Sequence, residues 1–570
     1  MAVRLAERLR DLHGNHRHRP PYLAGVLPLD REGTPLPYRV EPSPHQVVLS
    51  TPRGALRLAF LDEFTLHLTL PEGLGGVRFR PTGSYATIEG GHRWLGPRLT
   101  TCRVEAPHRL ERVERGEGEI VDLLVDGSGE VGAAFSITPE TPTFDRLPPP
   151  PVVHRAAAER WAAWFRRAPD VPAAWRRPYY AAWYLLRSHL LSPRGSLTRE
   201  GLAPSKDRYL GVWHWDALFH ALALRHVEPE LARDQIRLLL DHQLPNGMLP
   251  DVVHDEGLIV EADGVPVTKP PLLVWAALQL VEEDGDASFL AEVYEPAVRW
   301  TLWWFRENDD DGDGVVQYDH PFSSGLDNSP LWDDGVGVEA PDLNTFLVVQ
   351  LRGLAALARR FGRRREAERW SEEAHRLARR VVDHFYDPTS RFFWHQRDHR
   401  PVDVPTPFGL LPLWTGALTA PQREGLLAWL RSPQHFATPW PVPTVSRSHP
   451  SYDPEQMWRG PTWVNVNYLL VEALRTAGCA EEARRLADRT LALVAEAGEI
   501  AEYYHPEAGA PPERATRGFG WSAALFVDLL LRRTRGALPS HEDQHAALAA
   551  PDRLAEPSNG SLRERTPAGA

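Results

Sequence analysis

The chain has 570 residues, of which 42% are hydrophobic, 25% charged and 9% aromatic. This length is several times that of a typical single domain, and the composition is that of a globular protein rather than a disordered or fibrous one. The formal net charge of -12 argues against a protein that coats nucleic acid, because neutralising phosphates requires a basic surface. Length, composition and charge therefore predict a multidomain globular protein that has no nucleic-acid partner.

The start of the chain, MAVRLAERLRDL, has charges every few residues and lacks the apolar run of a secretory signal. No segment approaches the roughly 18 apolar residues of a membrane-spanning helix. The two cysteines, Cys102 and Cys479, fall in regions that we assign to different domains, so we expect no disulfide. These features predict a cytoplasmic protein without a membrane partner, and they leave a homo-oligomer open.

From about residue 22 to residue 139, apolar and polar residues alternate with a period of two, and Gly and Pro turns separate the segments. Leu56, Leu58 and Phe60, for example, alternate with Arg57 and Ala59. This pattern is typical of antiparallel strands and predicts a β-sandwich domain over residues 1–150. The proline run at 148–151 predicts a stiff connector, and we expect a linker and connecting helix over 151–171.

Beyond this point the period changes to 3.6, which indicates helices. Loops rich in Gly, Pro or polar residues follow alternate helices, which favours a toroid of inner and outer helices over 172–536 rather than a compact bundle. Residues 537–570 lack apolar periodicity and predict a disordered tail. The helical segments that we expect are 154–167, 172–192, 215–226, 228–243, 270–283, 287–306, 340–361, 364–386, 406–415, 421–431, 461–477, 480–497 and 518–535.

Tryptophan is unusually abundant: the chain has 20, and nineteen of them follow residue 150. We expect some, such as Trp161, Trp164, Trp300 and Trp370, to pack in helix cores, whereas others lie in loops beside carboxylates. Indole faces next to polar groups suit a sugar, whose C–H faces stack on rings while its hydroxyls bind polar partners. The loops with this composition are YLGVWHWDALFH (209–220), NGMLPD (246–251), HPFSSGLDNSPLWDDG (320–335), MWRGPTWVNVN (457–467) and AEYYHPEAG (501–509).

Cleaving a glycosidic bond requires two carboxyl groups, one protonated and one ionised. Asp327, flanked by Trp332, suits the general acid, because aromatic packing desolvates a carboxylate and raises its pKa. Glu502, beside Tyr503 and Tyr504, suits the general base in a partly wet setting that keeps it ionised. The alternatives are that Asp327 opens a turn or caps a helix and that Glu502 is a solvated loop acid.

An ordered series of motifs resembles enzymes related to glycoside hydrolase family 63, above all the mannosylglycerate and glucosylglycerate hydrolase-like enzymes. The resemblance covers roughly residues 175–535 and implies a mainly α fold, an (α/α)6 barrel catalytic domain that the N-terminal β-sandwich precedes. It also implies hydrolysis of an α-glycosidic bond with inversion. The motifs are VWHWDALFH, NGMLPD, a proline pair after Lys269, SSGLDNSPLWD, WRGPTWVNVNY, EYYHPEAG and FGWSAL.

Matched motif to motif, the resemblance places the general acid on Asp327 and the general base on Glu502. It assigns a further set of residues to the walls of the sugar pocket. These substrate-binding residues are Tyr209, Trp213, Trp215, Asp216, Lys269, Asn328, Trp332, Arg459, Gly460, Trp463, Tyr504 and Trp521.

Three of these polar residues have alternative roles. Asp216 takes sugar hydroxyls or caps the helix that follows it. Arg459 holds a hydroxyl or a carboxylate, or forms a structural ion pair. Lys269 stands where family members commonly carry Gln, and it either attracts an anionic aglycone such as glycerate or pairs with Asp251 or Glu261.

A separate acidic segment, residues 308–314, places Asp309, Asp311 and Asp313 at alternate positions before Gly314. This spacing copies the first half of a calcium loop. The acid expected at position 12 is replaced by His320, so the segment is no EF-hand. The segment is either a structural calcium site or a solvated turn, and no cofactor is expected to take part in the chemistry.

The sequence therefore predicts an inverting, exo-acting α-glycosidase for an α-glucoside or α-mannoside of small size. Glucosylglycerate, mannosylglycerate and short α-gluco-oligosaccharides are the candidate substrates. A trehalase or glucan-debranching α-glucosidase, a non-catalytic carbohydrate-binding toroid and a phosphorolytic or eliminative enzyme on the same barrel are the alternatives.

Overall fold

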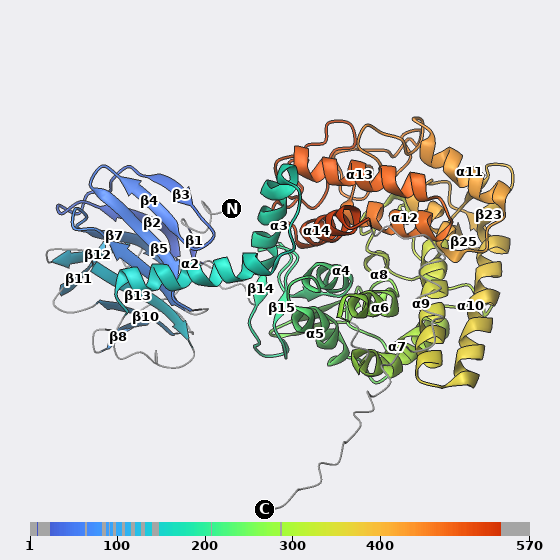
Figure 1. Ribbon diagram of the computed structural model, residues 1–570, viewed down its shortest axis with the longest axis horizontal. Helices are drawn as coiled ribbons and strands as arrows, with labels where there is room; N and C mark the ends of the chain where they lie inside the picture. Colours follow the sequence, from blue (N-terminus) through green and yellow to red (C-terminus); the bar gives the residue numbers. More distant parts are fainter. Residues whose placement is uncertain are drawn as a thin grey trace, which may run out of the picture.

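The computed structural model describes an N-terminal part built of strands and a larger part built of helices (Figure 1). The mainly helical fold with N-terminal antiparallel sheets that the sequence predicts is confirmed. The predicted tail at 537–570 lies outside the described residues. The described residues are 8–9, 23–62, 65–81, 87–89, 92–94, 99–104, 109–115, 120–126, 131–138, 148–206, 208–284 and 288–536.

The strands of the N-terminal part form two larger antiparallel sheets and one short pair, β8–β9. One sheet has the order β1-β2-β7-β12-β11, and the other has the order β10-β13-β6-β5-β4-β3. The strands predicted from the period of two are present. Their bounds are β1 Arg8–Leu9, β2 Leu23–Leu29, β3 Arg39–Pro42, β4 Val47–Thr51, β5 Gly54–Phe60, β6 Thr65–Leu70, β7 Gly76–Pro81, β8 Thr87–Glu89, β9 His92–Trp94, β10 Leu99–Val104, β11 Arg109–Arg115, β12 Ile120–Asp126 and β13 Val131–Thr138.

One detail of the strand pattern is wrong. Leu56 and Leu58 are buried as the alternation predicts, but Phe60 is 47% exposed and Ala59 is buried instead. Ala59 packs against Val153 and Ala157 of helix α2 (Pro150–Arg167). Since α2 covers the end of β5 from the opposite face, the alternation breaks there.

Helix α2 joins the two parts of the molecule (Figure 1). The proline run predicted as a stiff connector instead begins this helix, because the first turn tolerates prolines that lack an N–H. The Arg160 guanidinium donates to the carbonyl oxygen of Phe60, and Trp164 is buried in the core of the helical part. One continuous helix therefore contacts both parts.

All thirteen helical segments predicted from the 3.6 period are present, with ends that differ by a few residues. The segment near 406–415 is a 3-10 helix, η3 (Pro407–Thr415), because Pro412 lacks the N–H of an α-helical bond. Two short helices, α8 (Pro321–Ser324) and η2 (Pro330–Trp332), were not predicted. The remaining helices are η1 Ala173–Trp175, α3 Arg176–Ser188, α4 His214–Leu224, α5 Pro229–Leu240, α6 Leu273–Asp284, α7 Ser288–Glu307, α9 Pro341–Arg360, α10 Arg364–Phe385, α11 Ala420–Arg431, α12 Val464–Thr476, α13 Ala480–Glu496 and α14 Gly520–Thr534.

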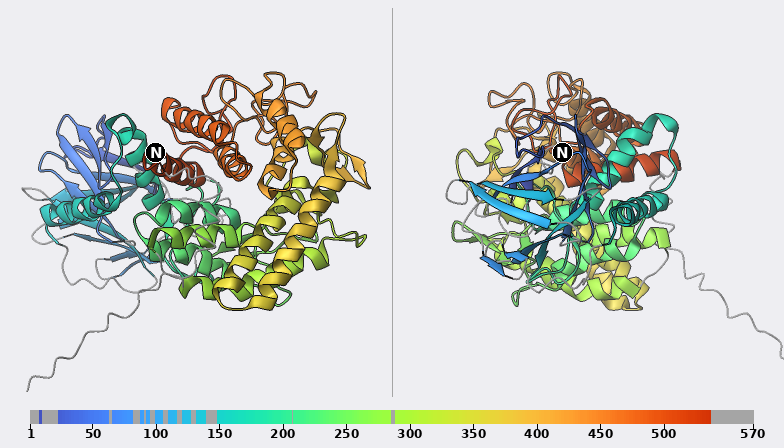
Figure 2. Two further views of the ribbon diagram at one scale, coloured as in Figure 1. Left: turned by 45° about the vertical axis from the view of Figure 1, so that its right-hand side comes forward. Right: turned by 90° about the vertical axis from the view of Figure 1, so that its left-hand side faces the viewer.

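Alternate helices of this part contact one another in a closed series. Helix α4 contacts α6, α6 contacts α9, α9 contacts η3, η3 contacts α12, α12 contacts α14, and α14 contacts α4. The helices between them in the chain pack outside, as the α9–α10 pair shows (Figure 2). Short strands connect the helices: β14 Leu190–Leu191, β15 Gly201–Leu202, β16 Val212–Trp213, β17 Val252–His254, β18 Gly257–Ile259, β19 Glu261–Ala262, β20 Val265–Pro266, β21 Gln317–Tyr318, β22 Val338–Glu339, β23 Tyr386–Asp387, β24 Phe392–Phe393, β25 Gln396–Arg397 and β26 Arg400–Pro401.

A buried carboxylate closes this series where its last helix meets its first. Asp528 of α14 accepts hydrogen bonds from Arg225 (2.8 Å) and His226 (2.9 Å), which follow α4, and from the hydroxyl of Tyr468 in α12 (2.6 Å). Burial alone would raise the pKa of Asp528, but Arg225 and His226 hold this pKa well below its usual range. The ionised carboxylate therefore binds three segments together in the interior.

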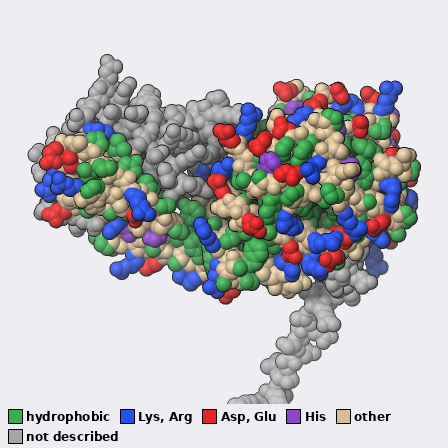
Figure 3. Space-filling model, turned by 90° about the horizontal axis from the view of Figure 1, so that it is seen from above, with side chains coloured by type: hydrophobic (Ala, Val, Ile, Leu, Met, Phe, Trp, Pro, Cys, Tyr) green, Lys and Arg blue, Asp and Glu red, His purple; other side chains and the backbone are tan. Residues whose placement is uncertain are grey.

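The surface carries charges of both signs. On the face seen in Figure 3, basic and acidic side chains of the described residues are interspersed over the helical part. Among the described residues, none of the helices combines the length and the apolar character that crossing a bilayer requires.

Replacing Asp528 tests the closure. We expect Asp528→Ala to lower the free energy of unfolding by about 3–5 kcal/mol, because it leaves Arg225 buried without its carboxylate. Urea unfolding followed by tryptophan fluorescence measures this loss, since the tryptophans lie almost entirely in the helical part. Asp488→Ala is the control: it breaks the exposed Asp488–Arg533 pair of α13 and α14 and should cost less than about 1 kcal/mol. Similar losses in the two variants would contradict the closing role.

Candidate active site

Nine residues singled out in the sequence line one cavity, although they come from distant parts of the chain. The cavity lies beside the N-terminal ends of three neighbouring helices, α4, α12 and α14, which Trp213, Trp463 and Phe519 precede. The lining consists of Pro204, Tyr209, Trp213, Trp215, Asp216, Lys269, Gly325, Asp327, Met457, Trp458, Trp463, Glu502, Phe519 and Trp521. Asp327 and Glu502 are thus in the same cavity.

Indole rings form much of the wall. Trp458 and Trp463 stack with their centroids 3.7 Å apart and their planes 8° apart. The ring centroid of Trp521 lies 5.5 Å from that of Trp463 and 5.4 Å from that of Trp215, and the Trp521 and Trp215 rings meet edge to face. These contacts fix the rings relative to one another, and they give the cavity the apolar faces that a sugar ring can stack on.

A tight loop holds Asp327 in place. Gly325 ends α8 in the left-handed conformation (φ +75°), and a β-carbon there would approach the Trp215 ring to 2.3 Å. Ser329 caps η2 by accepting from the N–H of Leu331, and the Trp332 indole N–H donates to the carbonyl oxygen of Leu326 (2.8 Å). Ser329, rather than Asp327, therefore caps the following helix, and the Asp327 carboxyl faces the cavity.

The surroundings of Asp327 favour its protonated form. Burial, opposed by Lys269 and reinforced by the nearby carboxyls Asp251 and Glu502, raises the pKa of Asp327 to about 7 in all. Close to neutral pH, this carboxyl therefore holds a proton in a substantial fraction of molecules, which is the property of a general acid.

Glu502 lies on the loop between α13 and α14. Its backbone N–H donates to Thr516, and its side chain accepts from the Thr516 N–H (3.1 Å) and bonds the Tyr209 hydroxyl. The prediction that this acid is partly wet is wrong: Glu502 is only 2% exposed, because the Thr516 segment covers it. Burial raises the pKa of Glu502 above its usual value, and the hydrogen bonds from Thr516 and Tyr209, which favour the ionised form, offset part of this rise.

Lys269 faces the cavity and is paired. Its ammonium lies 2.7 Å from Asp251 and donates to the carbonyl oxygen of Phe322 in α8. It also lies 5.9 Å from the centroid of the Trp213 ring. Of the two partners considered, Asp251 is the one that pairs with Lys269, and the same ammonium offsets the negative charge of Asp327.

Two polar atoms of the lining have no protein partner among the described residues. Asp216 is buried in the first turn of α4, where it is not the N-cap, and its Oδ1 makes no hydrogen bond. The Trp521 indole N–H is likewise unpartnered. Buried polar groups are nearly always paired, so an acceptor and a donor left open on one cavity are suited to bind a hydroxyl-bearing ligand.

Five of the predicted substrate-binding residues do not line this cavity. Asn328 accepts from the Trp458 N–H (2.9 Å), and Arg459 forms a bidentate pair with Asp333 (2.6 and 2.9 Å). Tyr504 is fully buried, where its hydroxyl bonds the backbone of Glu499 and Ala501. Trp332 and Gly460 are likewise absent from the lining, and the backbone of Asp453 lies against Gly460. For Arg459 the structural ion pair is the alternative that the structure shows.

Five lining residues were not predicted. They are Pro204, Gly325, Met457, Trp458 and Phe519. Trp458 and Met457 directly precede Arg459 in a motif that we had singled out, and Phe519 precedes Trp521. The signal was therefore present, but the sequence alone does not say which residues of a loop face the cavity.

The cavity is narrow, with a volume of about 40 Å³. This is room for about three water molecules, since one needs about 10–15 Å³ of such volume. A sugar ring needs more room, so we expect side chains of the wall to move apart when one binds.

The residues at 309–313 fit calcium poorly. The carboxylates of Asp309, Asp311 and Asp313 lie close enough together to share an ion. Calcium, however, takes six to eight oxygen ligands, and imidazoles occupy two of these carboxylates: Asp311 lies 2.9 Å from Nε2 of His399, and Asp313 lies 3.7 Å from Nδ1 of His384. The predicted position-12 residue, His320, instead caps α8.

One cavity in the ring of helices combines two carboxyls in different environments, unpartnered polar groups and walls of indole rings. This combination defines a glycoside hydrolase. Residues 209–522 match the family described as the mannosylglycerate hydrolase MGH1-like glycoside hydrolase domain. This match spans more than half of the chain, and the chain belongs to that family. The resemblance to glycoside hydrolase family 63 drawn from the motifs is confirmed.

The chain is similar to enzymes of known activity. It is 28% identical to the mannosylglycerate hydrolase of Thermus thermophilus, over 59% of this chain and 96% of that one. It is 25% identical to the glucosylglycerate hydrolase of Mycolicibacterium hassiacum, over 56% of this chain and 92% of that one. The matches thus cover nearly the whole of each relative and a little over half of this chain.

Solved structures show the same relationship. A family 63 mannosylglycerate hydrolase from Thermus thermophilus, in complex with glucose, has a TM-score of 0.54 at 25% identity, over 62% of this chain and 99% of that one. A bacterial glucoamylase complexed with acarbose has a TM-score of 0.58 over 90% of this chain and 89% of that one, at 11% identity. The second likeness concerns the fold alone, and it extends into the strands before the helices.

The raised pKa of Asp327 predicts a stability cost. A shift from 3.8 to about 7 disfavours the ionised folded form by up to roughly 4 kcal/mol, at about 1.4 kcal/mol per pKa unit. Stability that depends on this group is lost as the pH rises from about 4 to 7. We therefore expect Asp327→Asn to raise the melting temperature relative to wild type, and more at pH 8 than at pH 5, in a thermal unfolding scan.

Asp333→Asn is the matched control in the same loop. The hydrogen bond from Arg459 lowers the pKa of Asp333, so the stability it contributes is fully present at both pH values. This variant should lower the melting temperature by the same amount at pH 5 and at pH 8. A pH-independent effect of Asp327→Asn would show that its carboxyl titrates normally.

Proposed function

We propose that this protein is an inverting, exo-acting α-glycosidase that hydrolyses an α-glucoside or α-mannoside of small size. The observation that carries the proposal is that Asp327 and Glu502 line one indole-walled cavity, where the pKa of Asp327 is raised, chiefly by burial, to about 7 and Glu502 accepts hydrogen bonds from Thr516 and Tyr209 that favour its ionised form. One protonated and one ionised carboxyl are what general acid and general base catalysis requires. The small volume of the cavity supports an exo-acting enzyme, which binds one terminal sugar.

In the proposed reaction, Asp327 protonates the glycosidic oxygen while Glu502 removes a proton from a water molecule. That water attacks the anomeric carbon from the opposite face, so the configuration is inverted. The two carboxyl groups of an inverting enzyme stand about 6.5–9.5 Å apart to leave room for this water. Asp216 would accept hydrogen bonds from sugar hydroxyls, and the indoles of Trp215 and Trp521 would pack on the ring.

The substrate class rests on the relatives and on Lys269. The relatives act on mannosylglycerate and glucosylglycerate, whose glycerate carries a negative charge. Lys269 is the one cation in the cavity lining, and Asp251 shares its charge. Glycosylglycerates are therefore the first compounds to test, followed by trehalose and short α-gluco-oligosaccharides.

We also propose that the closed series of helices in residues 172–536 is an (α/α)6 barrel and that residues 1–150 form a β-sandwich domain. The ring of contacts from α4 to α14 supports the barrel, and the two sheets of the N-terminal part support the sandwich. Residues 151–171 would then be the linker and connecting helix.

A panel of α-glycosides tests the substrate and the stereochemistry together. We expect release of glucose or mannose from a glycosylglycerate, with the β-anomer appearing first in a proton NMR time course because the reaction inverts. Release of the α-anomer first would show retention and would contradict the mechanism. No release from any member of the panel would contradict the enzymatic function itself.

Variants of the two carboxyls test their roles. The pH profile of kcat/KM should fall on the alkaline side near pH 7, as Asp327 loses its proton, and on the acid side as Glu502 gains one. Asp327→Asn and Glu502→Gln should each lower kcat at least about 100-fold while the protein still binds the sugar. Asp333→Asn, a carboxyl of the same loop outside the cavity, should leave kcat unchanged. An alkaline limb that persists in a weakly active Asp327→Asn variant would place the acid elsewhere.

A further inference from the structure

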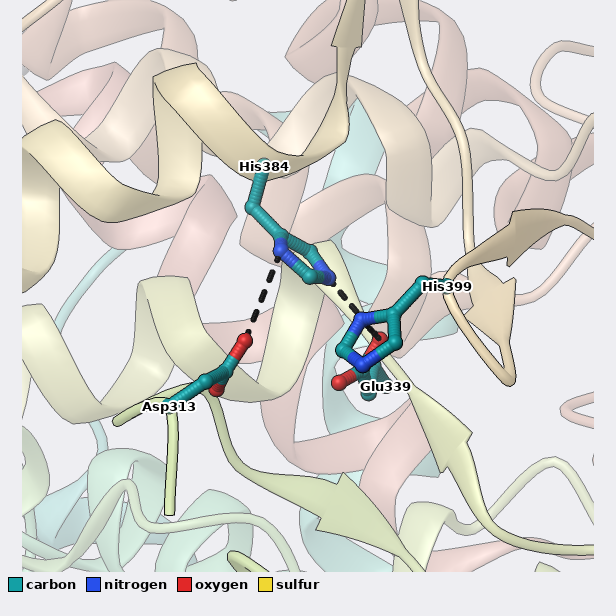
Figure 4. Close-up of side chains that lie close together, drawn as sticks. All are labelled: Asp313, Glu339, His384 and His399. Atoms are coloured by element: carbon teal, nitrogen blue, oxygen red, sulfur yellow. Dashed lines mark hydrogen bonds and ion pairs between the residues drawn. The ribbon is translucent and has the colours of Figure 1, made fainter. Parts of the chain in front are cut away.

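A second group of ionisable side chains lies away from the cavity lining, at the surface of the helical part. Asp313 follows α7, Glu339 is in β22, His384 is in the last turn of α10, and His399 is at the turn between β25 and β26 (Figure 4). One donor atom from each of the four lies within 4.8 Å of the others. The proposed hydrolysis uses none of these residues.

The distances between donors suit a small metal ion. His384 Nε2 lies 2.8 Å and His399 Nδ1 lies 3.9 Å from the same Glu339 oxygen, and His384 Nδ1 lies 3.7 Å from Asp313. In a tetrahedral site with metal–ligand bonds of about 2.0–2.1 Å, neighbouring donors stand about 3.3 Å apart. Only one nitrogen of His384 can ligate such an ion. With one donor atom from each residue, the four lie within 4.8 Å of one another, so side-chain rotations would bring them to this geometry.

The chemical nature of the four donor groups indicates which metal ion they would bind. Two imidazoles and two carboxylates suit zinc and similar transition-metal ions, whereas calcium takes oxygen ligands alone. Asp311 adds an outer contact: it lies 2.9 Å from Nε2 of His399, which leaves Nδ1 of that ring directed toward Glu339. A carboxylate that holds the far nitrogen of a metal-binding histidine is a recurrent feature of zinc sites.

The backbone at His399 gives independent support. Asp398 and His399 both have positive φ (50° and 56°), and they form the tight turn between β25 and β26. Turns of this kind favour Asn or Asp followed by Gly, because other side chains are strained there. The chain instead places an imidazole at the second position, where it lies beside Glu339 (Figure 4). The Nε2 of this imidazole also lies 2.9 Å from Asp311.

We propose that Asp313, Glu339, His384 and His399 bind one transition-metal dication of the zinc class, with Asp311 orienting His399. The site joins the loop after α7, strand β22, the end of α10 and the β25–β26 turn. It uses Asp313 of the segment for which the aspartate spacing left a calcium site and a solvated turn as alternatives.

The test uses the full-length protein, freed of metal by a chelator and then titrated calorimetrically with zinc chloride alone or calcium chloride alone. We expect one zinc ion per chain, bound more tightly than calcium, and a rise in melting temperature on adding zinc. Cobalt should bind in its place and give the visible absorption of a tetrahedral ion with nitrogen and oxygen ligands. Absence of zinc binding, or tighter binding of calcium than of zinc, would overturn the proposal.

His399→Asn is the variant of choice, because asparagine adopts the left-handed conformation of the turn more readily than histidine and should not disturb the fold. It should weaken zinc binding at least about 10-fold. The control is Asp398→Asn, which removes a charge at the neighbouring position of the same turn. It should leave zinc affinity within about twofold of wild type, a smaller change than the loss of a ligand causes. Zinc affinity unchanged by His399→Asn, or lowered equally by both variants, would show that the ion binds elsewhere.

Discussion

The buried Asp528 joins α14 to α4 and α12, and both sides of the cavity depend on this junction. Glu502 lies on the loop before α14, whereas Tyr209 and Trp215 lie just before and within α4, some 290 residues earlier in the chain. Only when the last helix packs beside the first does Tyr209 reach Glu502. A charge without solvent is costly unless it is paired and hydrogen-bonded, so Asp528 and its cationic partners favour this one arrangement over others.

The same physics, burial of charge, sets the chemistry of the cavity. Four carboxyls, Asp216, Asp251, Asp327 and Glu502, lie near one ammonium, Lys269, and burial raises the pKa of each of the four. Their partners differ. Lys269 contacts Asp251, the donors Thr516 and Tyr209 contact Glu502, and Asp327 accepts a hydrogen bond from its own backbone N–H. The two candidate catalytic groups are thus distinguished by their hydrogen-bond donors.

The spacing of hydrophobic residues predicts the helices and strands well, but it does not predict which distant segments pack against them. The helices were predictable because an amphipathic helix repeats its pattern over many residues, and the motif loops pointed to most of the cavity. The predictions failed where a distant segment decides: α2 reverses the burial of Ala59 and Phe60, the Thr516 segment covers Glu502, and Asp333 takes up the charge of Arg459. In each case the partner lies at least a dozen residues away, beyond what local composition reports.

The aspartate-rich segment shows how such partners change the meaning of a motif. In isolation, its alternating carboxylates resemble a calcium loop. In the fold the three carboxylates lie together. Burial raises the pKa of Asp309, and the charges of Asp313 and Asp311 raise it further. Glu339 adds a fourth carboxylate, and repulsion among them is opposed by His384, whose pKa the hydrogen bond to Glu339 raises despite burial. A proton on this imidazole and a metal ion are thus two ways to balance the same negative charge. Because the segment runs through β21 and α8 to Asp327, whichever cation balances it also fixes one end of the loop that holds the candidate acid.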